Sequence, residues 1–151
     1  MMRRSFTLIE VLVVIAVLAS MVAVLLPNYM EIRIKARDSK RKSELKNIQK
    51  ALEVYKNNRD PITYPTGLPP ACAQFVDAQN PSIVLMQKFP SEPLYNCTTG
   101  YYFSLTDVDT YELQGCLESK SDKDGSLCPN DFLAKTTMTC ASNNCYKLTE
   151  P

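Results

Sequence analysis

The sequence contains no histidine and no tryptophan, and it has only four glycines among 151 residues. Without histidine, the Ser-His and Cys-His pairs that activate most enzymatic nucleophiles cannot form. The spacing of the four glycines does not match a phosphate-binding loop. We therefore expect a protein that is not an enzyme and that uses no cofactor.

Cysteine is absent from the first 71 residues, and six cysteines occupy the rest of the chain. They are Cys72, Cys97, Cys116, Cys128, Cys140 and Cys145. An even number in a small domain is typical of disulfides, which form in oxidising compartments. Zinc is the competing explanation, but the chain has neither histidine nor a CxxC pair, so we expect no metal site. Among the many pairings that six cysteines allow, we predict Cys140 with Cys145, because Ala-Ser-Asn-Asn between them suits a tight turn.

A long apolar run fills residues 6–26 and contains one charged residue, Glu10. As a helix this run rises about 31 Å, enough to cross a hydrocarbon core of about 30 Å. A charge within such a helix costs roughly 2.5–3.5 kcal/mol, so Glu10 implies a partner. Two simpler interpretations compete: a cleavable secretory signal with a cut site near Val17 and Ala19, and a plain anchor with Glu10 near the membrane surface.

The start of the run combines a short basic leader, a small residue and the sequence Phe-Thr-Leu-Ile-Glu. These residues are Arg3, Arg4, Ser5, Phe6, Thr7, Leu8, Ile9 and Glu10. The pattern resembles the N-terminus of the type IV pilin and pseudopilin family, in which many members also carry a proline and a tyrosine at the positions of Pro27 and Tyr29. The resemblance implies that a prepilin peptidase cuts between Ser5 and Phe6 and that the new Phe6 amine is methylated. Ser5 stands where the family usually has glycine.

The resemblance further implies a structural subunit of a type IV pilus-like filament, assembled through Phe6, Glu10 and Pro27 of the N-terminal helix. Glu10 would pair with the Phe6 amine of an adjacent subunit. One alternative is a pseudopilin of a type II secretion or DNA-uptake system, and another is a membrane-anchored or secreted binding domain that does not polymerise. Between a surface filament and a pseudopilin, the expected disulfides favour the surface filament.

The expected partners are other copies or other pilins, the prepilin peptidase and methylase, the pilus assembly machinery and, before assembly, the membrane. No specific nucleic-acid partner is expected. The resemblance places the chain in the cytoplasmic membrane as a single-pass protein with its C-terminal domain outside. After assembly it would belong to an extracellular pilus or a periplasmic pseudopilus.

Residues 28–58 contain no glycine or proline and carry an apolar stripe with steps of three and four, which predicts an amphipathic continuation of the helix. The stripe comprises Leu45, Ile48, Leu52 and Tyr55. We expect it to pack against the C-terminal domain, and we expect a kink at Pro27 because a backbone hydrogen bond is lost there.

Residues 33–50 are strongly basic, with eight lysines and arginines against two acidic residues. Three interpretations of these basic residues compete. They form a solvated helix face, a surface that attracts anionic lipid or DNA, or a surface complementary in charge to neighbouring subunits. Because basic flanks tend to stay cytoplasmic, this stretch argues for a cytoplasmic C-terminal domain. The cysteines argue for an exported one, and we adopt that orientation.

Prolines at Pro61, Pro65, Pro69 and Pro70 end the helix and begin a globular head. Strands are predicted at 101–105, 110–118 and 145–149, with 106–109 as a hairpin turn and 83–89 as a strand or two helical turns. The acidic cluster at 121–126 is a solvent-exposed turn or, less well matched, a calcium loop.

The fold class is therefore α+β: a long N-terminal helix, half membrane-spanning and half amphipathic, packed on a small antiparallel sheet in a disulfide-stabilised, pilin-like head. The expected divisions are a cleaved leader (1–5), a transmembrane and assembly helix (6–27), its amphipathic continuation (28–58) and the disulfide-containing head (59–151). About ninety residues make a modest core, so disulfide support is physically sensible.

Overall fold

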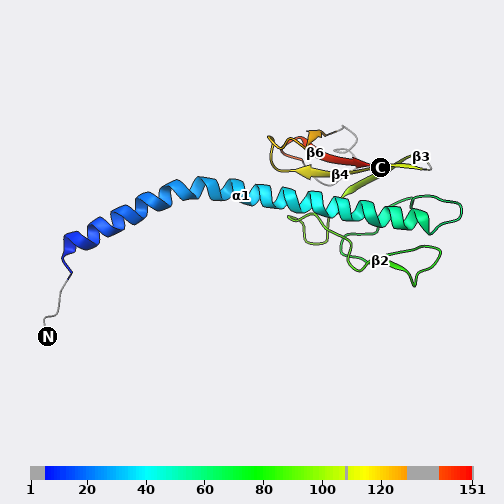
Figure 1. Cartoon of the computed structure of the whole chain (residues 1–151), viewed down its shortest axis with the longest axis horizontal. Coiled ribbons are helices and arrows are strands. Elements are labelled where there is room, and N and C mark those ends of the chain that lie inside the picture. The colour runs from blue at the N-terminus through cyan, green and yellow to red at the C-terminus, as the bar shows by residue number, and fades with distance from the viewer. Residues whose placement is uncertain (1–5, 108, 129–139, 151) are drawn as a thin grey trace. The chain divides into compact units, whose positions relative to one another are not determined.

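The structure is a computed structural model that describes residues 6–107, 109–128 and 140–150. Within them it has one helix, α1 (Leu8–Asn57), and six strands (Figure 1). The strands are β1 (Phe75–Val76), β2 (Val84–Met86), β3 (Tyr102–Asp107), β4 (Thr110–Leu117), β5 (Ser126–Leu127) and β6 (Asn144–Thr149). The chain divides into two compact units, Met1–Lys35 and Ala36–Pro151.

The first unit contains the N-terminal part of α1, whose large apolar side chains are exposed. From Leu8 to Val24 each of them has at least half of its surface accessible. By length and composition α1 includes a segment able to cross a membrane, with a mean hydropathy of 2.9 over 18 residues and none of that window buried. The helix assignment continues through Pro27. An apolar helix of this kind needs lipid or other helices around it.

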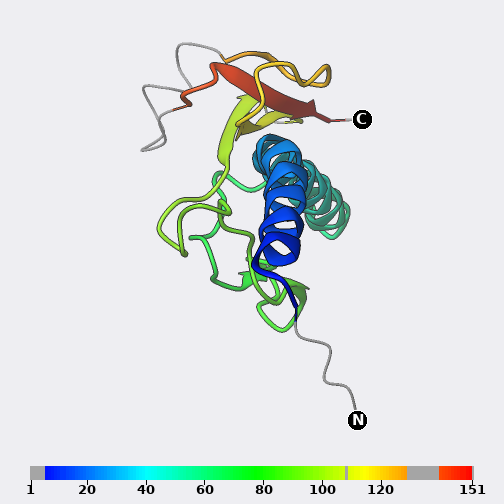
Figure 2. The same cartoon turned by 90° about the vertical axis from the view of Figure 1, so that its left-hand side faces the viewer.

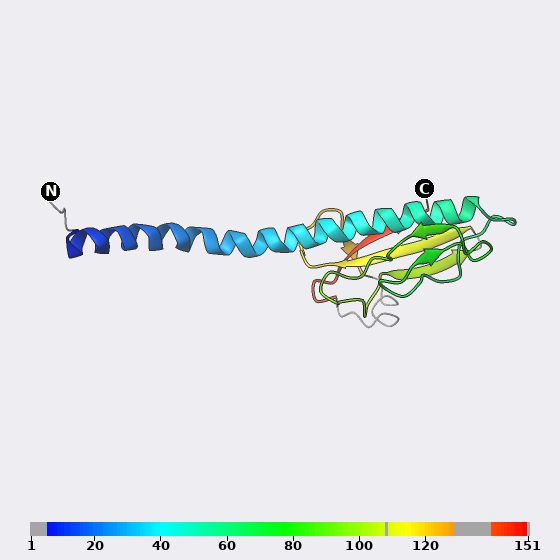
Figure 3. The same cartoon turned by 90° about the horizontal axis from the view of Figure 1, so that it is seen from below.

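The second unit is built around the last part of α1. Leu45, Ile48 and Leu52 are fully buried and Tyr55 nearly so, which confirms that the amphipathic stripe packs on the head. This stretch of α1 lies between the four-stranded sheet on one side and β1 and β2 on the other (Figure 2). Seen from below, β3 and β4 run along it (Figure 3).

The two sheets are antiparallel. The larger has the strand order β3-β4-β6-β5, and the smaller joins β1 to β2. The predicted hairpin corresponds to β3 and β4, with Phe103 opposite Leu113, and the predicted third strand is β6. The segment left open as helix or strand contains β2. The α+β fold class and the disulfide-stabilised head are thus confirmed.

Three disulfides tie the second unit: Cys72–Cys97, Cys116–Cys140 and Cys128–Cys145. All six cysteines are therefore bridged, but the predicted Cys140–Cys145 pair is wrong. The turn between them forms through the backbone, since the Asn143 amide donates to the Cys140 carbonyl at 3.1 Å. The fold of the head instead joins cysteines that are 24 and 17 residues apart in sequence.

Gly115 of β4 provides a test of the packing between helix and sheet. A Cβ atom there would lie 2.8 Å from Leu45 Cδ1 and 3.1 Å from Tyr101 Cδ1, both on buried side chains. We expect Gly115→Ala to lower the free energy of unfolding of the second unit by about 1–3 kcal/mol through overpacking. Gly67→Ala, where no atom lies within 4 Å of the added Cβ, is the matched control. Urea unfolding of the detergent-solubilised chain measures both; equal stabilities would contradict the tight contact.

Candidate functional site

The predicted processing residues, Ser5 and Phe6, precede α1 in the chain, and the predicted assembly residues Glu10 and Pro27 belong to it. Ser5 lies outside the described residues, whereas Phe6 precedes the helix with 79% of its surface exposed. The Glu10 amide donates to the Thr7 carbonyl at 3.1 Å and, more weakly, to Thr7 Oγ1 at 3.4 Å. Thr7 is thus the N-cap, and Thr-Leu-Ile-Glu has the spacing of a capping box.

Glu10 occupies the first turn of α1, where the helix dipole favours a negative charge. Its carboxylate has no ion-pair partner in the described part of the chain. An ammonium group at Phe6 would be unfavourable at the same end of the helix, because the dipole there is positive. A carboxylate from its own or a neighbouring chain would compensate that charge.

The basic stretch contains internal ion pairs that the sequence analysis did not predict. Arg41 and Asp38 are about 1% exposed, and Arg41 Nη1 lies 2.7 Å from Asp38 Oδ1 and 2.7 Å from Glu118 Oε1. Its Nε donates to Glu92 Oε1. Burial would lower the pKa of Arg41, but the bonds to Glu92 and Glu118 outweigh it and raise that pKa. Arg41 therefore remains charged inside the head.

The same cluster joins α1 to the end of β4. Arg37 binds Glu118 with two parallel bonds of 2.7 and 2.5 Å, and Asp38 accepts the amides of Glu118 and Ser119 at 2.9 Å each. The hydrogen bond from Arg37, together with Arg41, outweighs burial and holds the pKa of Glu118 below 4.5. Removing one member would leave its buried partners uncompensated.

Lys42 of the basic stretch binds the acidic cluster that was weighed as a calcium loop. Its Nζ lies 2.6 Å from Asp122 Oδ1 and 2.8 Å from Asp124 Oδ2. The Asp124 amide also donates to Asp122 Oδ1, which is the geometry of a turn. A lysine of this chain thus binds the two carboxylates that a calcium ion would need.

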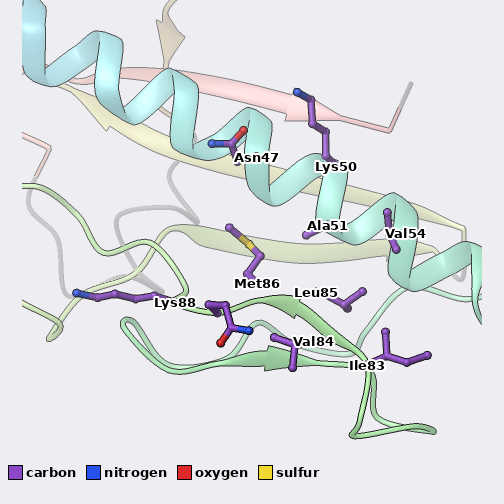
Figure 4. Close-up of a pocket in the computed structure, with 10 residues that line it drawn as sticks. Asn47, Lys50, Ala51, Val54, Ile83, Val84, Leu85, Met86 and Lys88 are labelled. Atoms are coloured by element: carbon purple, nitrogen blue, oxygen red, sulfur yellow. The ribbon is translucent and has the colours of Figure 1, made fainter.

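An open apolar groove of about 600 Å³ lies between α1 and β2. Ala51 and Val54 line it from the helix, and Val84 and Met86 line it from the strand (Figure 4). Across residues 6–107, 109–128 and 140–150, the one cluster of possible metal ligands is Cys128, Cys140 and Cys145, and all three are in disulfides. Lys50 and Lys88 also line the groove, which thus offers a mainly apolar contact surface.

Comparison with known proteins supports the N-terminal assignment. Residues 1–26 match the family model described as "Prokaryotic N-terminal methylation motif". Over 63 residues the chain is 40% identical to the type II secretion system core protein G of Pectobacterium carotovorum and 42% identical to that of Aeromonas hydrophila. These matches confirm the resemblance of the N-terminal part of the chain to pilins and pseudopilins.

The similarity covers 40% of this chain, and 40% and 44% of those two relatives. The chain thus spans less than half the length of the curated relatives it matches. A protein of the same name from Klebsiella pneumoniae is 40% identical over 63 residues, or 45% of its length. No solved structure is significantly similar to the chain.

The ion-pair cluster predicts how the stability of the head depends on pH. Because folding lowers the pKa of Glu118, its contribution is fully present above 4.5 and is lost as pH falls through the folded-state value. We expect Glu118→Gln to lower the free energy of unfolding by roughly 1–3 kcal/mol at neutral pH and to flatten its decline below pH 4.5.

Glu112→Gln, which removes an ion pair with Lys147, is the control. It should change stability by about 1 kcal/mol or less, because both side chains are at least 32% exposed. Denaturant unfolding across pH measures all three proteins. Parallel pH curves for the wild type and Glu118→Gln would contradict the assignment.

Proposed function

We propose that this chain is a structural subunit of a type IV pilus-like filament, cut between Ser5 and Phe6 by prepilin peptidase and assembled through its N-terminal helix. The observation that carries the proposal is an uncovered apolar helix that begins with a methylation motif. Lipid surrounds that helix before assembly, and helices of neighbouring subunits surround it afterwards.

Before assembly, residues 6–27 anchor the chain in the cytoplasmic membrane, 28–58 continue the helix and 59–151 form the exported head. Three disulfides support export, because such bonds persist in oxidising compartments. The basic stretch at 33–50 had argued for a cytoplasmic C-terminal domain. The internal ion pairs of Arg37, Arg41 and Lys42 weaken that argument. Those side chains are bound to carboxylates of the head instead of being free to interact with a cytoplasmic membrane surface.

Glu10 provides a physical basis for subunit register. In the filament its carboxylate pairs with the Phe6 amine of an adjacent subunit in surroundings of low dielectric constant. A charge without its partner is costly there, so subunits dock at the position that pairs the two groups. Pro27 belongs to the same assembly helix and permits a local change of direction.

A second candidate function is a pseudopilin of a type II secretion system. It is favoured by the relatives, which are named type II secretion system core protein G. The helix does not separate the two candidates, because pilins and pseudopilins both use it. The three disulfides favour a surface filament, which is exposed to mechanical and proteolytic stress. Polymerisation through the N-terminal helix is proposed for both candidates.

Substitutions at Glu10 separate charge pairing from helix capping. Glutamine keeps a side-chain oxygen that can accept the hydrogen bond of the N-cap backbone amide in a capping box, but it removes the charge. We expect Glu10→Gln to insert in the membrane and to reduce sheared filament, relative to membrane-bound subunit, by at least about tenfold, since an unpaired charge in a dry interface costs more than 1.4 kcal/mol. Quantitative immunoblotting of both fractions gives the ratio.

Glu31→Gln is the matched control, because Glu31 is exposed and pairs with Lys35 of its own helix. It should assemble like the wild type. Normal assembly of Glu10→Gln together with failure of Glu10→Ala would assign Glu10 to capping and remove the pairing mechanism.

A further inference from the structure

Two of the three disulfides are in contact with one another. Cys128 Sγ, of the Cys128–Cys145 bridge, lies 3.5 Å from Cys140 Sγ, of the Cys116–Cys140 bridge. The sulfurs of Cys128, Cys140 and Cys145 lie within 4.8 Å of one another in a buried cluster, against which Cys116 packs partly exposed. Four sulfurs thus share one site, and Cys72–Cys97 lies outside it.

The backbone of the sheet also fits the opposite pairing. Cys116 and Cys145 are directly opposite partners in the β4–β6 ladder. Opposite residues of antiparallel strands project to the same face with Cβ atoms about 4.5–5.5 Å apart, close to the separation that a disulfide spans. Cys128 and Cys140 already have their sulfurs in contact. Changing partners therefore requires side-chain rotation and little movement of the backbone.

We propose that this cluster is a site of thiol–disulfide exchange, where Cys116–Cys140 and Cys128–Cys145 interconvert with Cys116–Cys145 and Cys128–Cys140. The co-reactant is a thiolate, from a small thiol or from an oxidoreductase of the disulfide isomerase class. The proposal concerns only the head, so it is independent of filament assembly.

The exchange conserves electrons and consumes no oxidant. The external thiolate attacks Sγ of Cys116, the partly exposed cysteine of the four; the bond to Cys140 breaks and Cys140 leaves as a thiolate. Cys140 then attacks Cys128 Sγ across the 3.5 Å contact, and Cys145 leaves as a thiolate. Cys145 finally attacks Cys116 Sγ from the opposite strand and releases the external thiolate. The cluster can thus correct its own pairing inside a folded head, whereas Cys72–Cys97 has no neighbouring bridge in this cluster with which to exchange.

The Cys116→Ser variant tests the central step without an added thiol. Its lone Cys140 thiolate faces the Cys128–Cys145 bridge, so we expect the free thiol to be shared between Cys140 and Cys145. The full-length protein is held at mildly alkaline pH, where thiolate forms, and is then labelled with iodoacetamide. Trypsin leaves Cys140 and Cys145 in one peptide, 136–147, and fragmentation between them locates the label.

Cys72→Ser is the matched control, because it also leaves one thiol, at Cys97. We expect label on Cys97 alone, which excludes general scrambling. Label confined to Cys140 in Cys116→Ser would overturn the proposal, and so would label spread over all cysteines in the control.

If Cys116→Ser loses its fold by circular dichroism, the wild type decides. Incubated with a small monothiol and then mapped, it should show both pairings in the cluster and an unchanged Cys72–Cys97 bridge. A single pairing that persists after this incubation would overturn the proposal.

Discussion

The apolar side chains between Leu8 and Val24 present half or more of their surface to the surroundings. Each such side chain costs about 1.5–3 kcal/mol when it stays in water instead of an apolar environment. The helix therefore requires lipid or other helices, and this requirement connects the two states of the proposed function, a membrane-anchored subunit and an assembled polymer. In the proposed filament Glu10 would set the register of the subunits, because a lone carboxylate in an apolar helix favours the arrangement that supplies a positive partner.

The head meets a different requirement, which is to hold the last part of α1 on a small core. Apolar packing by Leu45, Ile48 and Leu52 supplies one set of contacts. Arg37, Arg41 and Lys42 supply a second, because they reach carboxylates on segments 51 to 82 residues away in sequence. The disulfides fix the loops and strand ends around these contacts.

Local patterns predicted the elements of the fold but not their long-range pairing. The steps of three and four in α1, and the two strand-forming runs on either side of a short turn, were sufficient for the stripe and the hairpin, since these depend on neighbours in sequence. Arg41 could not be recognised as buried, because a basic helix face looks the same whether its partners are water or Glu92. The predicted Cys140–Cys145 bridge was wrong for a related reason: the turn was local, but the nearest sulfurs came from β4 and from Cys128. At the N-terminus the spacing of Thr7 and Glu10 also predicts a capping box, which the interpretation of Glu10 as an ion-pair partner did not include.

The central claim, that the chain is cut before Phe6 and then polymerises, is tested most directly by the N-terminal sequence and intact mass of the protein in surface-sheared material and in membranes. The account predicts an N-methylated Phe6 as the first residue, with three disulfides, in the polymer fraction. If that fraction is a periplasmic pseudopilus, the same N-terminus would instead be found with the cell envelope in high-molecular-weight form. A mature protein that begins at Met1 or after Ala19 would contradict the account.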